Sequence, residues 1–156
     1  MHKALLVMLI AAAACGGTGG ASSGAVPGGP TTQSDPGAAT PKAAITAFMA
    51  AIKLQDLDAL SLIWGSEKGA ARDIVPADQL RKRELIMECY FQHDRYVITS
   101  DVESSSGLHV VMLSVTKGSF TRETQTQVLL GPKNRWYVAN PSLEPLKDLC
   151  AGAVAK

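Results

Sequence analysis

The stretch that decides the fold is Leu108-His-Val-Val-Met-Leu-Ser-Val-Thr-Lys-Gly-Ser-Phe-Thr-Arg-Glu-Thr-Gln-Thr-Gln-Val-Leu-Leu130. Residues 108–116 carry Val, Leu and Met on both faces, which is typical of a strand in the middle of a sheet. Lys117-Gly118 turns the chain, and residues 120–130 form the next strand, with one polar face made by Thr121, Glu123, Gln125 and Gln127. The stretch predicts two antiparallel strands joined by a tight turn.

Further strands are predicted on both sides of this pair. After His93-Asp94 the sequence has a period of two, in which one face is Tyr96, Ile98, Ser100 and Val102 and the other is Arg95, Val97, Thr99 and Asp101. Residues 104–107 supply a turn, and residues 131–134 supply another before a last strand over residues 135–139. The second half of the domain is therefore expected to be an antiparallel meander, followed by a short helical segment within residues 142–150.

Helical patterns precede the strands. Thr40-Pro41 is a helix start, because a hydroxyl caps the first turn and proline has no N–H to satisfy there. The buried stripe of this helix is expected to be Ile45, Phe48, Met49 and Ile52. Asp56 is expected to cap a second helix that ends near Trp64-Gly65. Residues 66–75 are predicted to be a loop, and residues 76–91 a third helix. The basic run at 81–83 on that helix is expected to face solvent.

Helices followed by a meander predict an α+β domain whose N-terminal helices pack on one face of a curved antiparallel sheet. This order resembles the nuclear-transport-factor-2-like cone, the fold of ketosteroid isomerase, over about residues 40–140. The best local match is Gly131-Pro-Lys-Asn-Arg-Trp-Tyr-Val-Ala139, which looks like the turn and Trp-x-Val strand that close such domains. The resemblance implies a pocket between helices and sheet, used for catalysis, binding or core packing, and is compatible with a homodimer through the open sheet face.

The first twenty residues indicate export. His2 and Lys3 precede the apolar run Ala4–Ile10, which is too short to span a membrane. Small residues then lead to Cys15, and the stretch resembles a bacterial lipoprotein signal, in which such a cysteine receives a diacylglycerol. Ala12 stands where Leu is typical, and Ala12-x-Ala14 equally fits an ordinary signal-peptidase site, so a soluble secreted protein is the alternative. Gly16 after the cysteine implies the outer membrane in the pattern of enteric bacteria.

The chain thus divides into four parts. Residues 1–14 are expected to be a signal peptide, and residues 15–39 the lipid-anchor cysteine with a flexible linker rich in Gly, Ser and Pro. Residues 40–150 form the cone-like domain and residues 151–156 a C-terminal tail. The linker has almost no large apolar side chain, so burial cannot offset the entropy of ordering it.

Charge and cysteines limit the partners and the compartment. The chain has a formal net charge of +1, which falls to zero when Lys3 leaves with the leader. A neutral domain has no electrostatic reason to bind nucleic acid or an anionic membrane, so membrane contact is expected only through a lipid on Cys15. Cys89 and Cys150 can form one intramolecular disulfide in an oxidising compartment, with two separate thiols as the alternative.

No established catalytic or metal-binding pattern is present in the sequence. His-Glu-x-x-His, Cys-x-x-Cys and Gly-x-Ser-x-Gly are absent, so we expect neither a metal nor a cofactor and assign no catalytic residue. Candidate ionisable or aromatic pocket residues are Trp64, Tyr96, His109 and Arg122, with Asp94 and Asp101 as further carboxylates. The structural interpretation is favoured for two of these residues: Trp64 plugs the end of a helix, and His109 is a hydrogen-bonded histidine at the sheet rim.

Two functions follow from these features. The first is a cell-envelope lipoprotein whose small domain binds a small ligand or an envelope protein without chemistry. The alternative is a secreted enzyme of the isomerase or dehydratase type that uses the same pocket. The two differ in one requirement, because the enzyme needs an ionisable residue on the inner face of the sheet with an organised partner.

Overall fold

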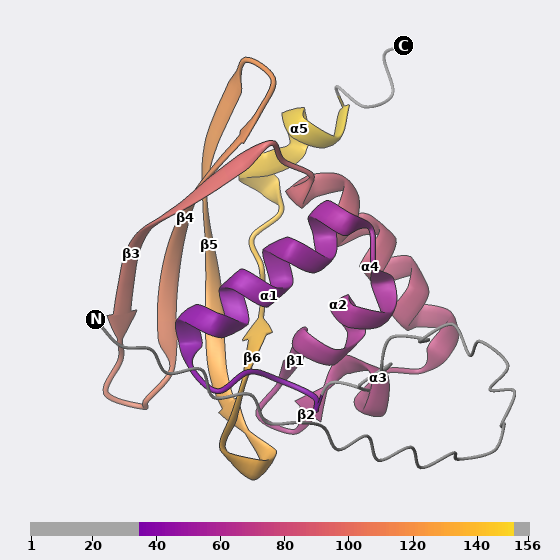
Figure 1. Ribbon diagram of the computed structural model, residues 1–156, viewed down its shortest axis with the longest axis vertical. Helices are drawn as coiled ribbons and strands as arrows, with labels where there is room; N and C mark the ends of the chain where they lie inside the picture. The colour runs from indigo at the N-terminus through magenta and orange to yellow at the C-terminus, as the bar shows by residue number, and fades with distance from the viewer. Residues whose placement is uncertain (1–34, 152–156) are drawn as a thin grey trace, which may run out of the picture. The chain divides into compact units, whose positions relative to one another are not determined.

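The computed structural model describes residues 35–151, which form a mixed helix and sheet domain (Figure 1). Its helices are α1 (Pro41–Leu54), α2 (Leu57–Ile63), α3 (Ala71–Ile74), α4 (Ala77–Phe91) and α5 (Lys147–Ala151). Its strands are β1 (Gly65–Ser66), β2 (Gly69–Ala70), β3 (Arg95–Glu103), β4 (His109–Lys117), β5 (Phe120–Gly131) and β6 (Arg135–Ala139), with 3-10 turns at Pro132–Asn134 and Glu144–Leu146. The large sheet is antiparallel in the order β3-β4-β5-β6, so the predicted meander is confirmed.

The predicted helix starts are confirmed in detail. The Thr40 hydroxyl accepts a hydrogen bond from the backbone N–H of Ala43 at 3.1 Å. The Asp56 carboxylate accepts one from the N–H of Ala59 at 2.9 Å. Each side chain satisfies an N–H that has no partner within its own helix, and this fixes where α1 and α2 begin.

The helices cover one face of a curved sheet (Figure 1). The predicted stripe of α1, namely Ile45, Phe48, Met49 and Ile52, is completely buried. Phe48 meets Phe91 of α4 edge to face, with ring centroids 5.4 Å apart. The sheet side of this core is Val111, Leu113, Val115, Val128 and Val138. The α+β architecture with a curved antiparallel sheet is therefore confirmed.

Residues 66–75, predicted to be a loop, contain regular structure instead. β1 and β2 form a small antiparallel pair in which Gly65 lies opposite Ala70, and α3 follows at once. Gly65 allows this pairing, because a Cβ at that position would collide with the carbonyl oxygen of Gly69. Strands this short leave no periodic signal in the sequence.

The folded part begins before Thr40, inside the segment assigned to the linker. Ala38 pairs with Trp136 through two backbone hydrogen bonds of 2.9 and 2.8 Å. The Arg135 guanidinium donates to the carbonyl oxygens of Pro36, at 3.2 Å, and Gly37, at 2.7 Å. These contacts use main-chain atoms, so the Gly- and Pro-rich composition gives no sign of them. They cover part of the outer edge of β6 and move the start of the domain back to about residue 35.

β3 carries a bulge that reverses its side-chain alternation. Ile98 pairs with Leu113, but the next pair is Ser100 with Met112, so Thr99 is the extra residue. From there on Asp101, opposite Val111, shares the inner face with Ile98. The prediction that Ser100 and Val102 lie on the same face as Tyr96 is therefore wrong. A bulge inserts one unpaired residue and re-aims every side chain after it, which a regular period of two cannot foresee.

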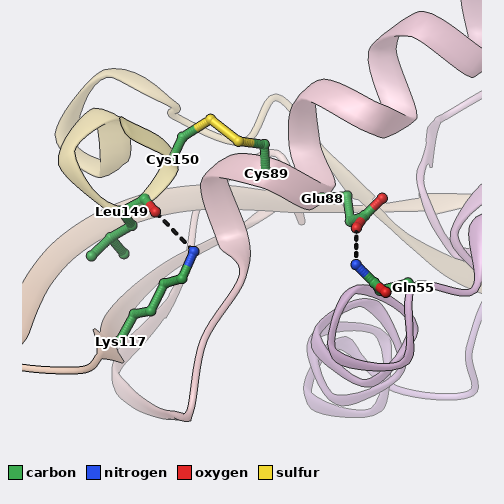
Figure 2. The surroundings of a disulfide bond; sticks show 6 residues. All are labelled: Gln55, Glu88, Cys89, Lys117, Leu149 and Cys150. Carbon is green, nitrogen blue, oxygen red and sulfur yellow. Dashed lines mark hydrogen bonds between the residues drawn. A yellow bond between two sulfur atoms is a disulfide. The ribbon is translucent and has the colours of Figure 1, made fainter. Parts of the chain in front are cut away.

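Cys89 of α4 and Cys150 of α5 form the predicted disulfide, with Cα atoms 5.0 Å apart (Figure 2). It closes a loop with a sequence separation of 61 residues. In the chain-entropy model a loop of this size contributes roughly 4 kcal/mol to stability. Nearby, the Lys117 ammonium donates to the carbonyl oxygen of Leu149 at 2.9 Å. The C-terminal segment is thus held to both α4 and β4.

The expectations for the chain ends concern residues outside this range. Cys15, the signal peptide 1–14, the linker up to residue 34 and the tail 152–156 lie outside the described residues. Within residues 35–151, no helix combines the length and the apolar character needed to cross a membrane.

Candidate functional site

The four predicted pocket residues do not converge on one site. Tyr96 lies near the start of β3 and pairs with Val115. His109 lies at the other end of the sheet, opposite Glu103. Arg122 is on β5 and Trp64 follows the end of α2. Tyr96 and His109 therefore belong to two different places on the domain.

Arg122 and Trp64 serve the fold. The Arg122 guanidinium donates to the Asp148 carboxylate at 2.8 Å and lies over the ring of Phe120, 5.5 Å from its centroid. This pair helps to hold α5 against β5. The Trp64 side chain is half-buried against the core, and the backbone N–H of Trp64 donates to the carbonyl oxygen of Leu60. Its position agrees with the interpretation of an aromatic plug at a helix end.

A pocket lies between α1 and the start of β3, and we call it the α1–β3 pocket. Its volume is about 380 Å³, and its lining residues are Thr46, Met49, Ala50, Lys53, His93, Asp94, Arg95 and Tyr96. Positions 46, 49, 50 and 53 fall on one side of a helix, since they are three, four and seven residues apart. The chain from α4 into β3 supplies the opposite wall. Of the predicted candidates, Tyr96 and Asp94 belong here.

His93 is the buried polar group of this pocket, with 6% of its surface exposed. Its Nδ1 lies 2.9 Å from the carbonyl oxygen of Phe91. A carbonyl can only accept, so Nδ1 carries the hydrogen and Nε2 is left as an acceptor. Burial lowers the pKa of His93, and the nearby Lys53 charge lowers it further, although the bond to Phe91 acts in the other direction. The imidazole is therefore neutral at pH 7.

Lys53 and Asp94, two charged groups of the pocket, are each held by a main-chain contact. The Lys53 ammonium donates to the carbonyl oxygen of Asp94 at 3.0 Å. The Asp94 carboxylate accepts the N–H of Gly118 at 2.7 Å. Neither Lys53 nor Arg95 forms an ion pair with a carboxylate in the part of the chain that the structure describes. The pocket therefore offers two cations that form no ion pair, one carboxylate and one neutral acceptor.

A second ionisable pair lies on the inner face at the far end of the sheet. Because of the bulge at Thr99, Asp101 faces His109, and its Oδ1 is 2.7 Å from Nδ1 of the histidine. The His109 ring also meets Trp136 edge to face, with centroids 5.1 Å apart. A carboxylate that accepts from Nδ1 leaves Nε2 free as an acceptor. This is an organised histidine–carboxylate pair at the rim, with both side chains partly exposed.

Glu84 is a buried carboxyl that neither site uses. It lies on the inner side of α4 with 3% of its surface exposed, and its Oε1 has no hydrogen-bond partner. Burial raises its pKa, the charge of Asp58 on α2 raises it further, and Arg81 partly opposes this. It is a local weakness in the packing of α2 against α4.

Sequence reasoning missed His93 and Lys53 as pocket residues. They are forty positions apart and meet only because α1 packs beside the start of β3. The one local signal is the histidine at the junction of a helix and a strand, where side chains often line a site. Between residues 35 and 151, no three His, Cys, Asp or Glu side chains are grouped so that they could hold a metal ion.

Comparison of the chain with protein-family models, with curated proteins and with solved structures gives no match.

Replacing Glu84 with glutamine should stabilise the protein at neutral pH. The unfolded carboxyl titrates near 4.5, and the folded one at a higher pH. As the pH rises through 4.5, the unfolded state loses its proton first, so the free energy of unfolding decreases. We expect Glu84→Gln to raise the free energy of unfolding at pH 7 by about 1 kcal/mol, the order of an unpaired buried polar group. Urea denaturation at several pH values measures this.

The difference between wild type and Glu84→Gln should disappear below pH 4.5, where both states of the wild type are protonated. Glu67→Gln, at an exposed position, is the matched control and should change little. A Glu84→Gln protein that is less stable at every pH would contradict this interpretation of the buried carboxyl.

Proposed function

We propose that the chain is an exported cell-envelope lipoprotein whose folded part binds a small organic anion in the α1–β3 pocket and does not transform it. One observation carries the proposal: His93 places a neutral acceptor beside the Lys53 ammonium in a pocket of about 380 Å³. Cavities of this size are typical of small-molecule sites.

The lining defines the class of ligand. Lys53 and Arg95 favour a negative group, and Lys53 keeps two N–H donors after its bond to the Asp94 carbonyl. His93 Nε2 accepts a hydrogen bond, so the ligand needs a hydroxyl or N–H donor near its negative group. Met49 and Tyr96 supply an apolar wall. A hydroxycarboxylate meets all three requirements.

The same geometry argues against catalysis in this pocket. An efficient general base has a pKa close to the working pH, whereas burial lowers the pKa of His93 and so weakens it as a base. Its Nδ1 is held by a main-chain carbonyl, which offers no negative charge to stabilise a protonated ring. One oxygen of the Asp94 carboxylate accepts the N–H of Gly118. The groups of the pocket suit recognition.

The element order supports a further proposal about the class of the fold. Helices followed by a curved meander, closed by Trp136-x-Val138 in β6, agree with the resemblance to the nuclear-transport-factor-2-like cone. We propose that the whole domain has this cone fold. On this proposal the centre of the cone is filled by side chains such as Phe48 and Leu113, and ligand binding moves to the side where α1 meets β3.

Export and anchoring are supported by two independent features. The leader ends in small residues before Cys15, as in lipoprotein signals. The disulfide between Cys89 and Cys150 suits an oxidising compartment such as the cell envelope. A secreted enzyme is the second candidate function, and the His109–Asp101 pair favours it, since a carboxylate orients the imidazole as in known general bases.

The pocket is tested by titrating lactate, malate, tartrate and glucuronate into ¹⁵N-labelled protein, with glycerol and glucose as uncharged controls. We expect acids to shift the His93 ring signals and the uncharged compounds not to do so. Lys53→Met should weaken binding about tenfold or more, the order of one charged hydrogen bond. Lys42→Met, exposed on the same helix, should leave it unchanged.

Two results would contradict binding at this pocket: equal affinity for acids and sugars, or full affinity in Lys53→Met. The same samples address the enzyme alternative, because the spectrum of a bound acid should stay constant for days. Conversion of the acid that stops in His109→Gln and continues in His93→Phe would favour the enzyme.

Anchoring is tested on the full chain produced with its own leader in a bacterial host. Mass spectrometry of the membrane fraction should find a diacylglycerol on Cys15, since the apolar leader directs the cysteine to the lipid-transferring enzymes. Cys15→Ser should abolish the modification. A mature N-terminus without lipid, recovered in the soluble fraction, would leave only the secreted alternative.

A further inference from the structure

One face of α4 combines basic and apolar side chains. Leu85 and Ile86 are each 47% exposed, although most aliphatic side chains of this domain are buried. Lys82 lies one turn before both of them, and Arg81 and Arg83 flank the same surface. The opposite side of α4 is the buried one, with Glu84, Met87 and Phe91. We call residues 81, 82, 83, 85 and 86 the α4 face.

The cations of this face are compensated only in part. In the range that the structure describes, none of Arg81, Lys82 and Arg83 forms an ion pair with a carboxylate. Arg83 donates to the side-chain oxygen of Gln79, at 3.4 Å. Asp78 is exposed one turn before Arg81 and Lys82 on the same side of α4, so it lowers the local charge from +3 to +2. The net charge of the whole chain is +1, so charge is still segregated on the surface. The overall neutrality of the domain predicted that it does not bind an anionic membrane, but this prediction does not apply to the α4 face.

The neighbouring helix α3 also exposes an aliphatic side chain. Ile74 is 40% exposed and follows the exposed Arg72 on a helix that packs against α4. An aliphatic side chain and a cation are thus exposed together on the neighbouring helix, with the carboxylate of Asp73 between them. Such a pattern is typical of helices that lie in the headgroup region of a bilayer.

The chain that leads to Cys15 leaves the domain on this side. Asp35 lines a hollow together with Asp73 of α3 and Lys68, and Figure 1 shows the described chain starting close to α3 and β2. Residues 16–34 connect Asp35 with Cys15. A random-coil chain of that length has a root-mean-square span of roughly 25 Å. A lipid on Cys15 would therefore keep α3 and the start of α4 within reach of the membrane.

We infer that the α4 face docks on an anionic lipid surface, with Leu85 and Ile86 entering the headgroup region and Arg81, Lys82 and Arg83 at the phosphates. The inference rests on the proposed acylation of Cys15, because the lipid anchor would hold the domain at a high local concentration beside the membrane. A protein partner fits less well, because the face offers no Trp, Tyr or Phe, the side chains that anchor most protein interfaces. Docking would fix the orientation of the tethered domain.

The test uses the full chain recovered from membranes and reconstituted through its own anchor into vesicles. One set contains phosphatidylcholine alone and the other adds phosphatidylglycerol. An amine-reactive reagent then labels lysines, and mass spectrometry gives the rate at each position. We expect Lys82 to react about fivefold more slowly on the anionic vesicles, and high salt to remove the difference. Lys42 should react equally in both.

Paired variants separate docking from general effects. Leu85→Ser with Ile86→Ser should abolish the protection of Lys82, whereas Val97→Ser with Val102→Ser, also exposed aliphatic positions, should leave it intact. Equal Lys82 rates on the two kinds of vesicle would overturn the inference. So would protection of Lys82 in detergent without vesicles, which would indicate a protein contact.

The mass of the Cys15 peptide from the same preparation separates the two proposals. If Cys15 carries no lipid, anchoring has failed, and the labelling is repeated with the chain added to preformed vesicles. Protection of Lys82 on anionic vesicles would then still support docking, and its absence would overturn it.

Discussion

Burial of one side of α1 against the sheet is the constraint on which the rest of the structure depends. Phe48 and Ile52 have no exposed surface, and Phe48 also meets Phe91 of α4. Buried side chains of this size each contribute about 1.5–3 kcal/mol. With that side fixed, the next side of the helix must present Thr46 and Lys53 to the start of β3. The α1–β3 pocket is therefore a consequence of how the core packs.

The two histidines of the domain differ in their chemistry because their surroundings differ. His93 is buried and oriented by a main-chain carbonyl, so it stays neutral and offers an acceptor. His109 lies at the rim and is oriented by Asp101, which reaches it only because Thr99 is bulged out of the ladder. The first arrangement favours recognition of a ligand, and the second resembles the support given to a general base.

Local features of the fold could be predicted from the sequence, and long-range ones could not. The helix caps at Thr40 and Asp56 are predicted from the residues next to them in the sequence. The meander is predicted from turn residues and from the two-residue alternation of side chains along the strands. The bulge at Thr99 and the pairing of Ala38 with Trp136 depend on register and main-chain contacts between distant segments. Tyr96 is the one predicted pocket residue that lines the α1–β3 pocket, and the polar groups of that pocket come together only in three dimensions.

The protonation state of His93 tests the central claim most directly. Two-dimensional ¹H–¹⁵N spectra that correlate ring nitrogens with ring protons identify the tautomer, and a pH series gives the pKa. The account predicts a hydrogen on Nδ1, a bare Nε2 and a pKa below 6.5. It follows that stability declines as the pH falls below 6.5, because the unfolded chain takes up the proton first. A hydrogen on Nε2, or a pKa above 6.5, would contradict the account.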